Sequence, residues 1–255
     1  MRRKSSPAAL SALFAAGLAL LAACTTVPYT GRSQFNVMSE QEELSLGRQA
    51  AGQLLRSEPV SRNPEQNAAV RRVGRAIAAV SGMKGANWAF YVIDKKEPNA
   101  FCLPGGIIFV NSGIFAYARN DDQLAAVIGH EVAHALAHHG AERMSRQMAV
   151  ALPGVAVAGV LGTQSPELAG VFARVYGVGA QVGYALPHSR EQEYEADRIG
   201  LILMAKAGYD PEAAVSFWQN MRRAGGSRPP AFLSTHPAGD ARIKAIAAAL
   251  PEAKS

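Results

Sequence analysis

The stretch HEVAH, residues 130–134, lies inside the apolar run 124–136 and is the most informative part of this sequence. The run is apolar on most sides, which predicts a buried helix. Residues four positions apart lie on one face of a helix, about one turn from each other. His130 and His134 can therefore direct two imidazole nitrogens at one metal ion, and Glu131 beside them can accept a proton.

A second helix is predicted between Ser189, which forms a capping box with the glutamine three residues later, and Gly208. In this helix Glu193 and Asp197 are four positions apart, so their carboxylates share a face. A catalytic zinc ion usually has three protein ligands and one open position, and two histidines with one glutamate are an established set. A second carboxylate on that face can hold a ligand histidine through its other N–H. Spacing alone also permits Glu195 as the ligand, or a solvated acidic face without a metal.

Several separately placed motifs resemble those of one family. The segments HEVAHALAHH (130–139), SREQEYEADRIG (189–200) and LSTHPAGDARI (233–243) together resemble the HtpX-like and CAAX-prenyl-endopeptidase-type zinc metallopeptidases. The bacterial periplasmic lipoprotein branch of that family is the most similar. Residues 99–106 and 110–113 also follow the family's pattern, so the resemblance covers roughly residues 44–250.

The resemblance implies an α+β fold that is mainly α-helical. Such a zincin-type metalloprotease domain has a small β-sheet whose edge lies beside the active-site helix. The resemblance also implies that His130, His134 and Glu193 bind one Zn²⁺ per chain, and that Glu131 is the catalytic base. Asp197 would hold one of the ligand histidines in place.

A predicted hairpin precedes the active-site helix. Residues 100–103 and 107–111 predict two strands joined by a Pro-Gly-Gly turn, and residues 88–94 predict a third strand. In zinc proteases of this helical class, an edge strand beside the active-site helix pairs with the extended backbone of the substrate. We place that substrate-binding edge at Gly106, Ile107, Ile108, Phe109, Val110 and Asn111. An ordinary interior hairpin is the alternative.

His236 is the candidate regulatory residue, because it follows a loop with two glycines and two prolines at 225–230. The resemblance implies that it can reach the zinc and block the open position, from which a flexible loop could withdraw it. Alternatively, it stabilises the developing oxyanion, with Arg242 as another candidate for that role, or it has neither function. His138 and His139 lie off the face of the metal-binding pair, so we expect them to face solvent or to support a ligand.

The N-terminal sequence predicts where in the cell the protein is located. Residues 1–23 begin with a basic segment, continue with an apolar stretch too short to span a bilayer comfortably, and end in Leu-Ala-Ala before Cys24. This order resembles the lipobox of bacterial lipoproteins. We expect a lipoprotein signal peptide at 1–23, a lipid on Cys24, a lipidated tether at 24–40 and a zinc metallopeptidase domain at 41–255; a plain cleaved signal peptide is the alternative. Threonine rather than aspartate follows Cys24, which favours the outer over the inner membrane of the bacterial periplasm.

The charge balance excludes a nucleic-acid-binding protein. The chain of 255 residues has a formal net charge of +6, but residues 1–23 contain three basic and no acidic residues. Residues 24–255 therefore carry 23 basic and 20 acidic side chains, a balance that gives no basic surface for nucleic acid. The length fits one domain with a substantial core.

Residues 147–186 form an apolar region rich in glycine. Its prolines and glycines argue against a membrane span. We expect packed helices and loops beside the cleft, or a lid.

Together these features predict a zinc metalloendopeptidase of the bacterial envelope. The resemblance implies extended polypeptide substrates such as misfolded or stalled envelope and outer-membrane proteins, and the outer-membrane assembly machinery as a partner. Two other classes stay open at this point. One is a chaperone-like lipoprotein that seldom cleaves, and the other is an interaction protein whose zinc has a fourth ligand from the protein.

Overall fold

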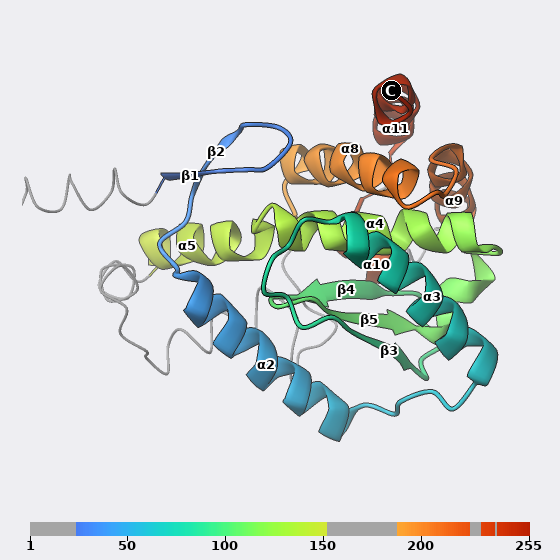
Figure 1. Cartoon of the computed structure of the whole chain (residues 1–255), viewed down its shortest axis with the longest axis horizontal. Coiled ribbons are helices and arrows are strands. Elements are labelled where there is room, and N and C mark those ends of the chain that lie inside the picture. Colours follow the sequence, from blue (N-terminus) through green and yellow to red (C-terminus); the bar gives the residue numbers. More distant parts are fainter. Residues whose placement is uncertain (1–23, 152–187, 225–230, 238) are drawn as a thin grey trace, which may run out of the picture.

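The computed structural model describes residues 24–151, 188–224, 231–237 and 239–255, which form helices around a three-stranded sheet (Figure 1). The helices are α2 (Glu40–Ser57), α3 (Pro64–Val80), α4 (Asp121–Leu136), α5 (His139–Ala151), α8 (Arg190–Lys206), α9 (Glu212–Ala224), α10 (Ala231–Thr235) and α11 (Asp240–Ala253), with a 3-10 turn at Ser112–Ala116. The strands are β1 (Cys24–Thr26), β2 (Ser33–Phe35), β3 (Ala89–Ile93), β4 (Ala100–Leu103) and β5 (Ile107–Asn111). The mainly helical α+β class is confirmed.

The order of strands in the sheet is β3-β5-β4, with β3 parallel and β4 antiparallel to β5. The predicted substrate-binding edge at Gly106–Asn111 is therefore wrong, because β5 is the central strand and its backbone groups pair on both sides. The hairpin itself forms as expected, and Gly105 and Gly106 take the positive φ angles of 91° and 85° that its turn requires. The edge strand that packs against α4 is β4.

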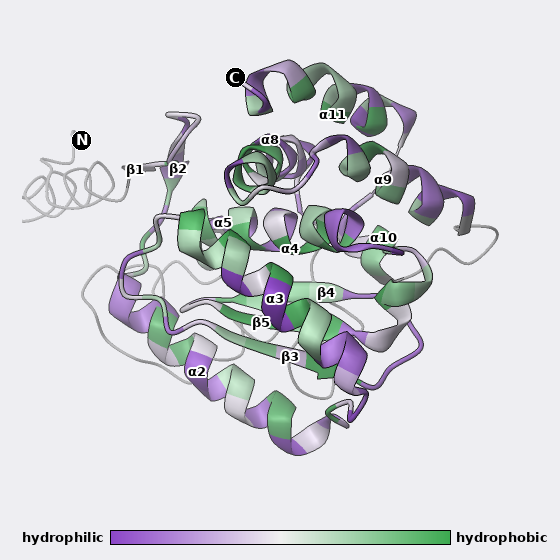
Figure 2. Cartoon of the chain, turned by 45° about the vertical axis from the view of Figure 1, so that its right-hand side comes forward, coloured by the Kyte–Doolittle hydropathy of each residue, from purple (hydrophilic) through white to green (hydrophobic). Residues whose placement is uncertain are grey.

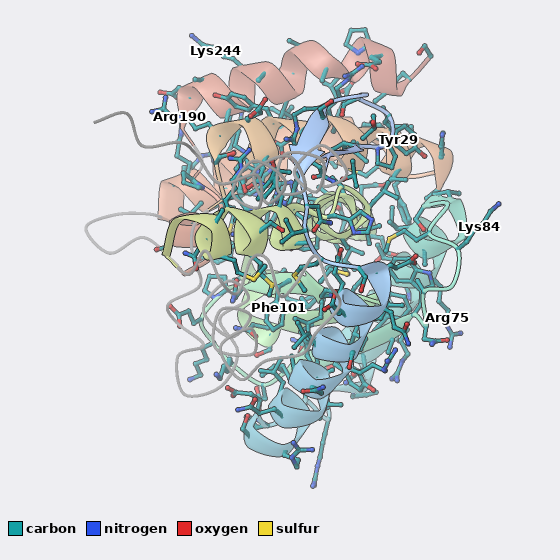
Figure 3. All side chains as sticks on the ribbon, turned by 90° about the vertical axis from the view of Figure 1, so that its left-hand side faces the viewer. Tyr29, Arg75, Lys84, Phe101, Arg190 and Lys244 are labelled. Atoms are coloured by element: carbon teal, nitrogen blue, oxygen red, sulfur yellow. The ribbon has the colours of Figure 1, made fainter. Side chains whose placement is uncertain are left out.

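Alternating residues of the sheet belong to two parts of the hydrophobic core. Cys102 and Ile108 pack into the cluster shared with α3, α4 and α8, whereas Leu103 and Phe109 pack into the cluster shared with α2 and α5. This alternation is what a sheet covered on both faces requires. Figure 2 shows the apolar strands enclosed between the helices, and Figure 3 shows charged side chains such as Arg75 extending outward.

Helices α4 and α8 approach closely next to the HEVAH stretch. A Cβ atom on Gly200 would lie 3.1 Å from the carbonyl carbon of Gly129 and 3.1 Å from the backbone nitrogen of His130. A larger residue at this point would push the two helices apart. Glycine therefore allows the acidic face of α8 to reach the histidines of α4.

Residues 24–36, expected to be part of a tether, instead fold against the domain. Strands β1 and β2 form an antiparallel hairpin, in which Cys24 pairs with Phe35. Val27 in its loop is 1% exposed, and Arg32 forms ion pairs with α5 and α8. The segment is therefore part of the folded domain, although several of its residues, such as Thr25, Tyr29 and Ser33, are exposed.

Three expectations fall outside the described residues: the signal peptide at 1–23, most of the apolar region 147–186, and the loop at 225–230 that precedes His236. Among the helices that the structure does describe, none combines the length and apolar composition needed to cross a membrane.

Candidate metal centre

Helix α4 carries the two histidines of the metal site on one face. Its N-terminus is fixed by Asn120, whose side chain accepts a hydrogen bond from the backbone N–H of Gln123. His130 and His134 are buried at 2% and 5% exposure, and their Nε2 atoms are 3.0 Å apart. The spacing argument is thus confirmed in three dimensions.

Helix α8 supplies a buried carboxylate to the same point. The predicted capping box between Ser189 and Gln192 is present. One turn later, Glu193 places Oε1 at 3.4 Å from His134 Nε2 and Oε2 at 3.6 Å from His130 Nε2. Glu195, the competing candidate that spacing left open, is directed elsewhere. The geometry selects Glu193.

The distances between these donors suit a tetrahedral metal ion. Zinc–nitrogen and zinc–oxygen bonds of about 2.0–2.1 Å place neighbouring ligand atoms about 3.3 Å apart. The separations of 3.0, 3.4 and 3.6 Å among His130, His134 and Glu193 lie around that value. Three ligands of the nitrogen and carboxylate-oxygen type are the donor set of a catalytic zinc site.

Two carboxylate oxygens in the cluster are buried and have no hydrogen-bond partner among the described residues, namely Glu131 Oε1 and Glu193 Oε2. Glu193 Oε2 lies 2.5 Å from Arg242 Nη1 as an ion pair, but outside hydrogen-bonding alignment. Burial raises the pKa of Glu131 above its usual value. Unpaired buried oxygens are costly unless a ligand satisfies them, so the site fits a metal ion and a water molecule.

Asp197 fixes His130 from the side away from the cluster. Its Oδ1 lies 3.0 Å from His130 Nδ1, so that Nδ1–H donates to the carboxylate and the Nε2 lone pair faces the metal position. Burial opposes protonation of this ring, but Asp197 and Glu193 raise the pKa of His130 to about 9. The carboxylates thus favour positive charge at this point.

Arg242 forms ion pairs with two carboxylates of α8, those of Glu193 and Asp197. Its Nε and Nη2 donate to Asp197 at 2.7 and 2.8 Å, and its guanidinium stacks 3.7 Å from the centre of the Trp218 ring. Buried at 3% exposure and paired in this way, Arg242 orients the acidic residues. This geometry favours a positioning role over the oxyanion contact that the sequence left open.

His139 fixes His134 in the corresponding way. His139 Nε2 lies 2.9 Å from Glu195 Oε2, and its Nδ1 lies 2.7 Å from His134 Nδ1. A carboxylate only accepts, so His139 carries its proton on Nε2, and its free Nδ1 accepts the Nδ1–H of His134. The lone pair of His134 Nε2 is then directed at the metal position. Burial lowers the pKa of His139, which keeps this ring neutral.

Glu195 in turn binds the N-terminal hairpin. Arg32 donates from Nε to Glu195 at 2.8 Å and from its two Nη atoms to Glu142 at 2.9 Å, and Thr30 also donates to Glu195. Although burial opposes ionisation, the bonds from His139, Thr30 and Arg32 lower the pKa of Glu195 to about 2. This contact could not be predicted from the sequence, because 163 residues separate Arg32 from Glu195.

His236 lies inside the metal cluster, directly after α10. Its Nδ1 is 3.2 Å from His130 Nε2 and 2.9 Å from Glu193 Oε1, and all four candidate ligand atoms of His130, His134, Glu193 and His236 lie within 4.8 Å of one another. Its Nε2 is 3.5 Å from Glu131 Oε1. His236 therefore stands where a fourth ligand would bind.

Comparisons with known proteins agree with this site. The model of Peptidase family M48 matches residues 64–250, a range that contains α4 and α8. The chain is 38% identical over 233 residues to the protein named mitochondrial metalloendopeptidase OMA1 of Schizosaccharomyces pombe, covering 89% of this chain and 67% of that protein. It is 30% identical over 223 residues to the β-barrel assembly-enhancing protease of Escherichia coli K12, covering 86% of this chain and 46% of that protein. The chain belongs to peptidase family M48, and its site is that of a metalloendopeptidase.

Proposed function

We propose that this chain is a zinc-dependent endopeptidase that hydrolyses extended polypeptides in the bacterial envelope. The observation that carries the proposal is the convergence of His130, His134 and Glu193 beside Glu131, whose buried Oε1 has no hydrogen-bond partner among the described residues. A site that only bound zinc for stability would have no use for this carboxylate.

The residues of the chain have separate tasks in the reaction. His130, His134 and Glu193 would hold the zinc ion, which when bound polarises the scissile carbonyl and acidifies a coordinated water molecule. Glu131 accepts the proton of the attacking water and returns it to the leaving amine. Burial, which raises the pKa of Glu131, makes this carboxylate a stronger base than an exposed one.

The edge of β4 is the proposed binding position for substrate. An edge strand has free backbone groups that pair with an extended peptide, and β4 packs against the active-site helix α4. This mode recognises unfolded chain rather than a folded surface. The name of the bacterial relative supports envelope and outer-membrane proteins as the substrate class and their assembly machinery as the setting.

We place the protein in the periplasm with a lipid on Cys24. The support is the Leu-Ala-Ala-Cys order at 21–24, which resembles a bacterial lipobox. The relatives named OMA1, by contrast, are mitochondrial proteins. Replacing Cys24 by serine should release the protein from outer-membrane fractions. Retention of the Cys24→Ser protein there would contradict lipid anchoring.

His236 is proposed to close the site in its resting state. Its Nδ1 stands at the fourth corner of the cluster, next to His130 Nε2 and Glu193 Oε1, and substrate binding would displace it. This position favours a latch over a direct contact with the oxyanion.

Casein cleavage tests the proposed activity. The purified full chain should cleave casein, lose that activity to a chelator such as 1,10-phenanthroline and regain it with Zn²⁺. A protein that contains zinc and binds casein, but leaves it intact, would instead be the chaperone-like lipoprotein.

A further inference from the structure

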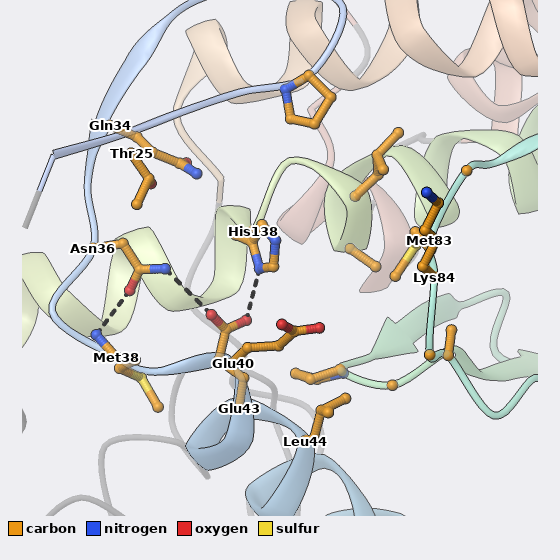
Figure 4. Close-up of a pocket in the computed structure, with 18 of the residues that line it drawn as sticks. Thr25, Gln34, Asn36, Met38, Glu40, Glu43, Leu44, Met83, Lys84 and His138 are labelled. Atoms are coloured by element: carbon orange, nitrogen blue, oxygen red, sulfur yellow. Dashed lines mark hydrogen bonds and ion pairs between the residues drawn. The ribbon is translucent and has the colours of Figure 1, made fainter. Parts of the chain in front are cut away.

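A cavity of about 400 Å³ lies away from the metal cluster, between the β1–β2 hairpin, the start of α2, residues 82–86 and the end of α4 (Figure 4). We refer to it as the hairpin pocket. None of its lining residues belongs to the group His130, His134, Glu193 and His236. The hairpin pocket is therefore separate from the metal site.

Gln34 on β2 is the unusual residue of this pocket. It is 3% exposed, it lines the cavity, and both its amide nitrogen and its amide oxygen are buried with no hydrogen-bond partner in the described part of the chain. Figure 4 shows its side chain extending from the hairpin toward the cavity. A buried amide that leaves both groups unpaired is costly, so it calls for a ligand that offers a donor and an acceptor together.

The polar groups next to Gln34 are already paired with one another. Glu43 accepts a hydrogen bond from Asn36 Nδ2 at 3.2 Å and pairs with His138 Nδ1 at 3.0 Å, while Asn36 Oδ1 accepts from the backbone N–H of Met38 at 2.9 Å. Figure 4 shows this chain of contacts along one wall. They form a polar wall whose groups pair with one another and not with the Gln34 amide.

The remaining walls combine apolar and charged side chains. Met38, Leu44, Met83 and Leu136 contribute apolar surface, and the exposed Glu40 and Lys84 contribute charges of both signs. A mixed lining of this kind accepts varied side chains. It suits a polypeptide better than a hydrocarbon chain, which would leave the amide unpaired.

We propose that the hairpin pocket binds a segment of an unfolded polypeptide, with the Gln34 amide pairing to a peptide group of its main chain. A peptide group presents one N–H and one C=O, which match the acceptor and donors of a primary amide. Pro104 and Gly105, which directly follow the edge strand β4, form part of the cavity wall. A chain that pairs with β4 can therefore continue into the pocket. This assignment of a substrate subsite rests on the proposed peptidase function.

Binding measured without cleavage tests the proposal. In the full-length Glu131→Gln protein, the fluorescence anisotropy of fluorescein-labelled casein should report binding, and Gln34→Leu should weaken it about tenfold. The matched control is Gln53→Leu, an exposed glutamine on α2, which should leave the affinity unchanged. Because the Gln34 amide makes no bond within the described chain, Gln34→Leu should not lower the melting temperature. A casein affinity within twofold of the parent in the Gln34→Leu protein would overturn the proposal.

Two further outcomes separate the explanations. If the wild-type chain does not cleave casein, but Gln34→Leu still abolishes casein binding, the peptide site stands and the proposed peptidase function is wrong. Displacement of casein by dodecanoate, with an affinity for casein unchanged by Gln34→Leu, would assign the pocket to an acyl chain and overturn the peptide assignment.

Discussion

Two clusters on either side of His134 contain the same residue types but differ in how their polar atoms are satisfied. In the inner cluster, around His130 and Glu193, two carboxylate oxygens have no hydrogen-bond partner within the described residues. In the outer cluster, Glu195 accepts from His139, Thr30 and Arg32. The buried oxygens without a hydrogen bond mark the inner cluster as a ligand site, whereas the three bonds accepted by Glu195 mark it as support for the ligand histidines. The number of charged side chains alone would not distinguish the inner cluster from the outer cluster.

Glu131→Gln should give the largest change in activity. The amide cannot accept the proton of the attacking water, so casein turnover should fall by about 10²–10⁴-fold while bound zinc stays at wild-type level. Casein turnover and zinc content, measured on the same preparation, check both expectations. Turnover within tenfold of wild type would remove Glu131 as the base.

His139→Ala should weaken the metal site from outside it. His134 would lose the acceptor that fixes its Nδ1–H, so zinc affinity should fall about 10–100-fold, as measured by competition with a chelating dye. His138→Ala is the matched control, because His138 pairs with Glu43 and not with a metal ligand. Equal losses in both variants would show that the outer cluster has no specific role.

His236→Ala distinguishes a closing ligand from a catalytic group. If His236 occupies the fourth position at rest, its removal should keep zinc bound and raise the initial rate of casein cleavage several-fold. A decrease of about a hundredfold would instead assign it to stabilisation of the transition state.

Glu142→Gln should have the smallest effect and should appear in stability. Burial opposes ionisation of Glu142, but its bonds with Arg32 and Gln192 lower its pKa from the ordinary value of 4.5. Its stabilisation is therefore complete above pH 4.5 and is lost as the pH falls below that value. Urea unfolding should show the variant less stable at pH 7 by about 1.5–3 kcal/mol, with a smaller gap at pH 3. The exposed Glu97→Gln control should show no gap at either pH.

The parts of the site that sequence predicted are those set by local periodicity. Residues four apart in α4 and α8 share a face because of helix geometry, which made His130, His134, Glu193 and Asp197 candidates. The choice of Glu193 over Glu195 as the ligand came from the family resemblance. Strand positions also followed from local pattern. The order β3-β5-β4 did not, because strand neighbours depend on pairing between distant segments.

The support of the metal site from the hairpin could not be predicted for the same reason. The bond between Arg32 and Glu195 joins residues 163 positions apart, and the polar segment around Arg32, with a proline and a glycine, has the composition of a linker. Only the folded chain shows that these polar residues are buried partners.

Zinc content in two neighbouring glutamate variants tests the assignment of the inner and outer clusters most directly. Glu193 and Glu195 lie two residues apart on the same helix, but Glu193 faces the Nε2 atoms of His130 and His134, whereas Glu195 faces His139 Nε2. Elemental analysis of the purified full chain should find about one zinc per wild-type chain. Glu193→Ala should contain almost none, and Glu195→Ala should keep its zinc under excess metal. Full zinc occupancy in Glu193→Ala, with loss in Glu195→Ala, would contradict the assignment.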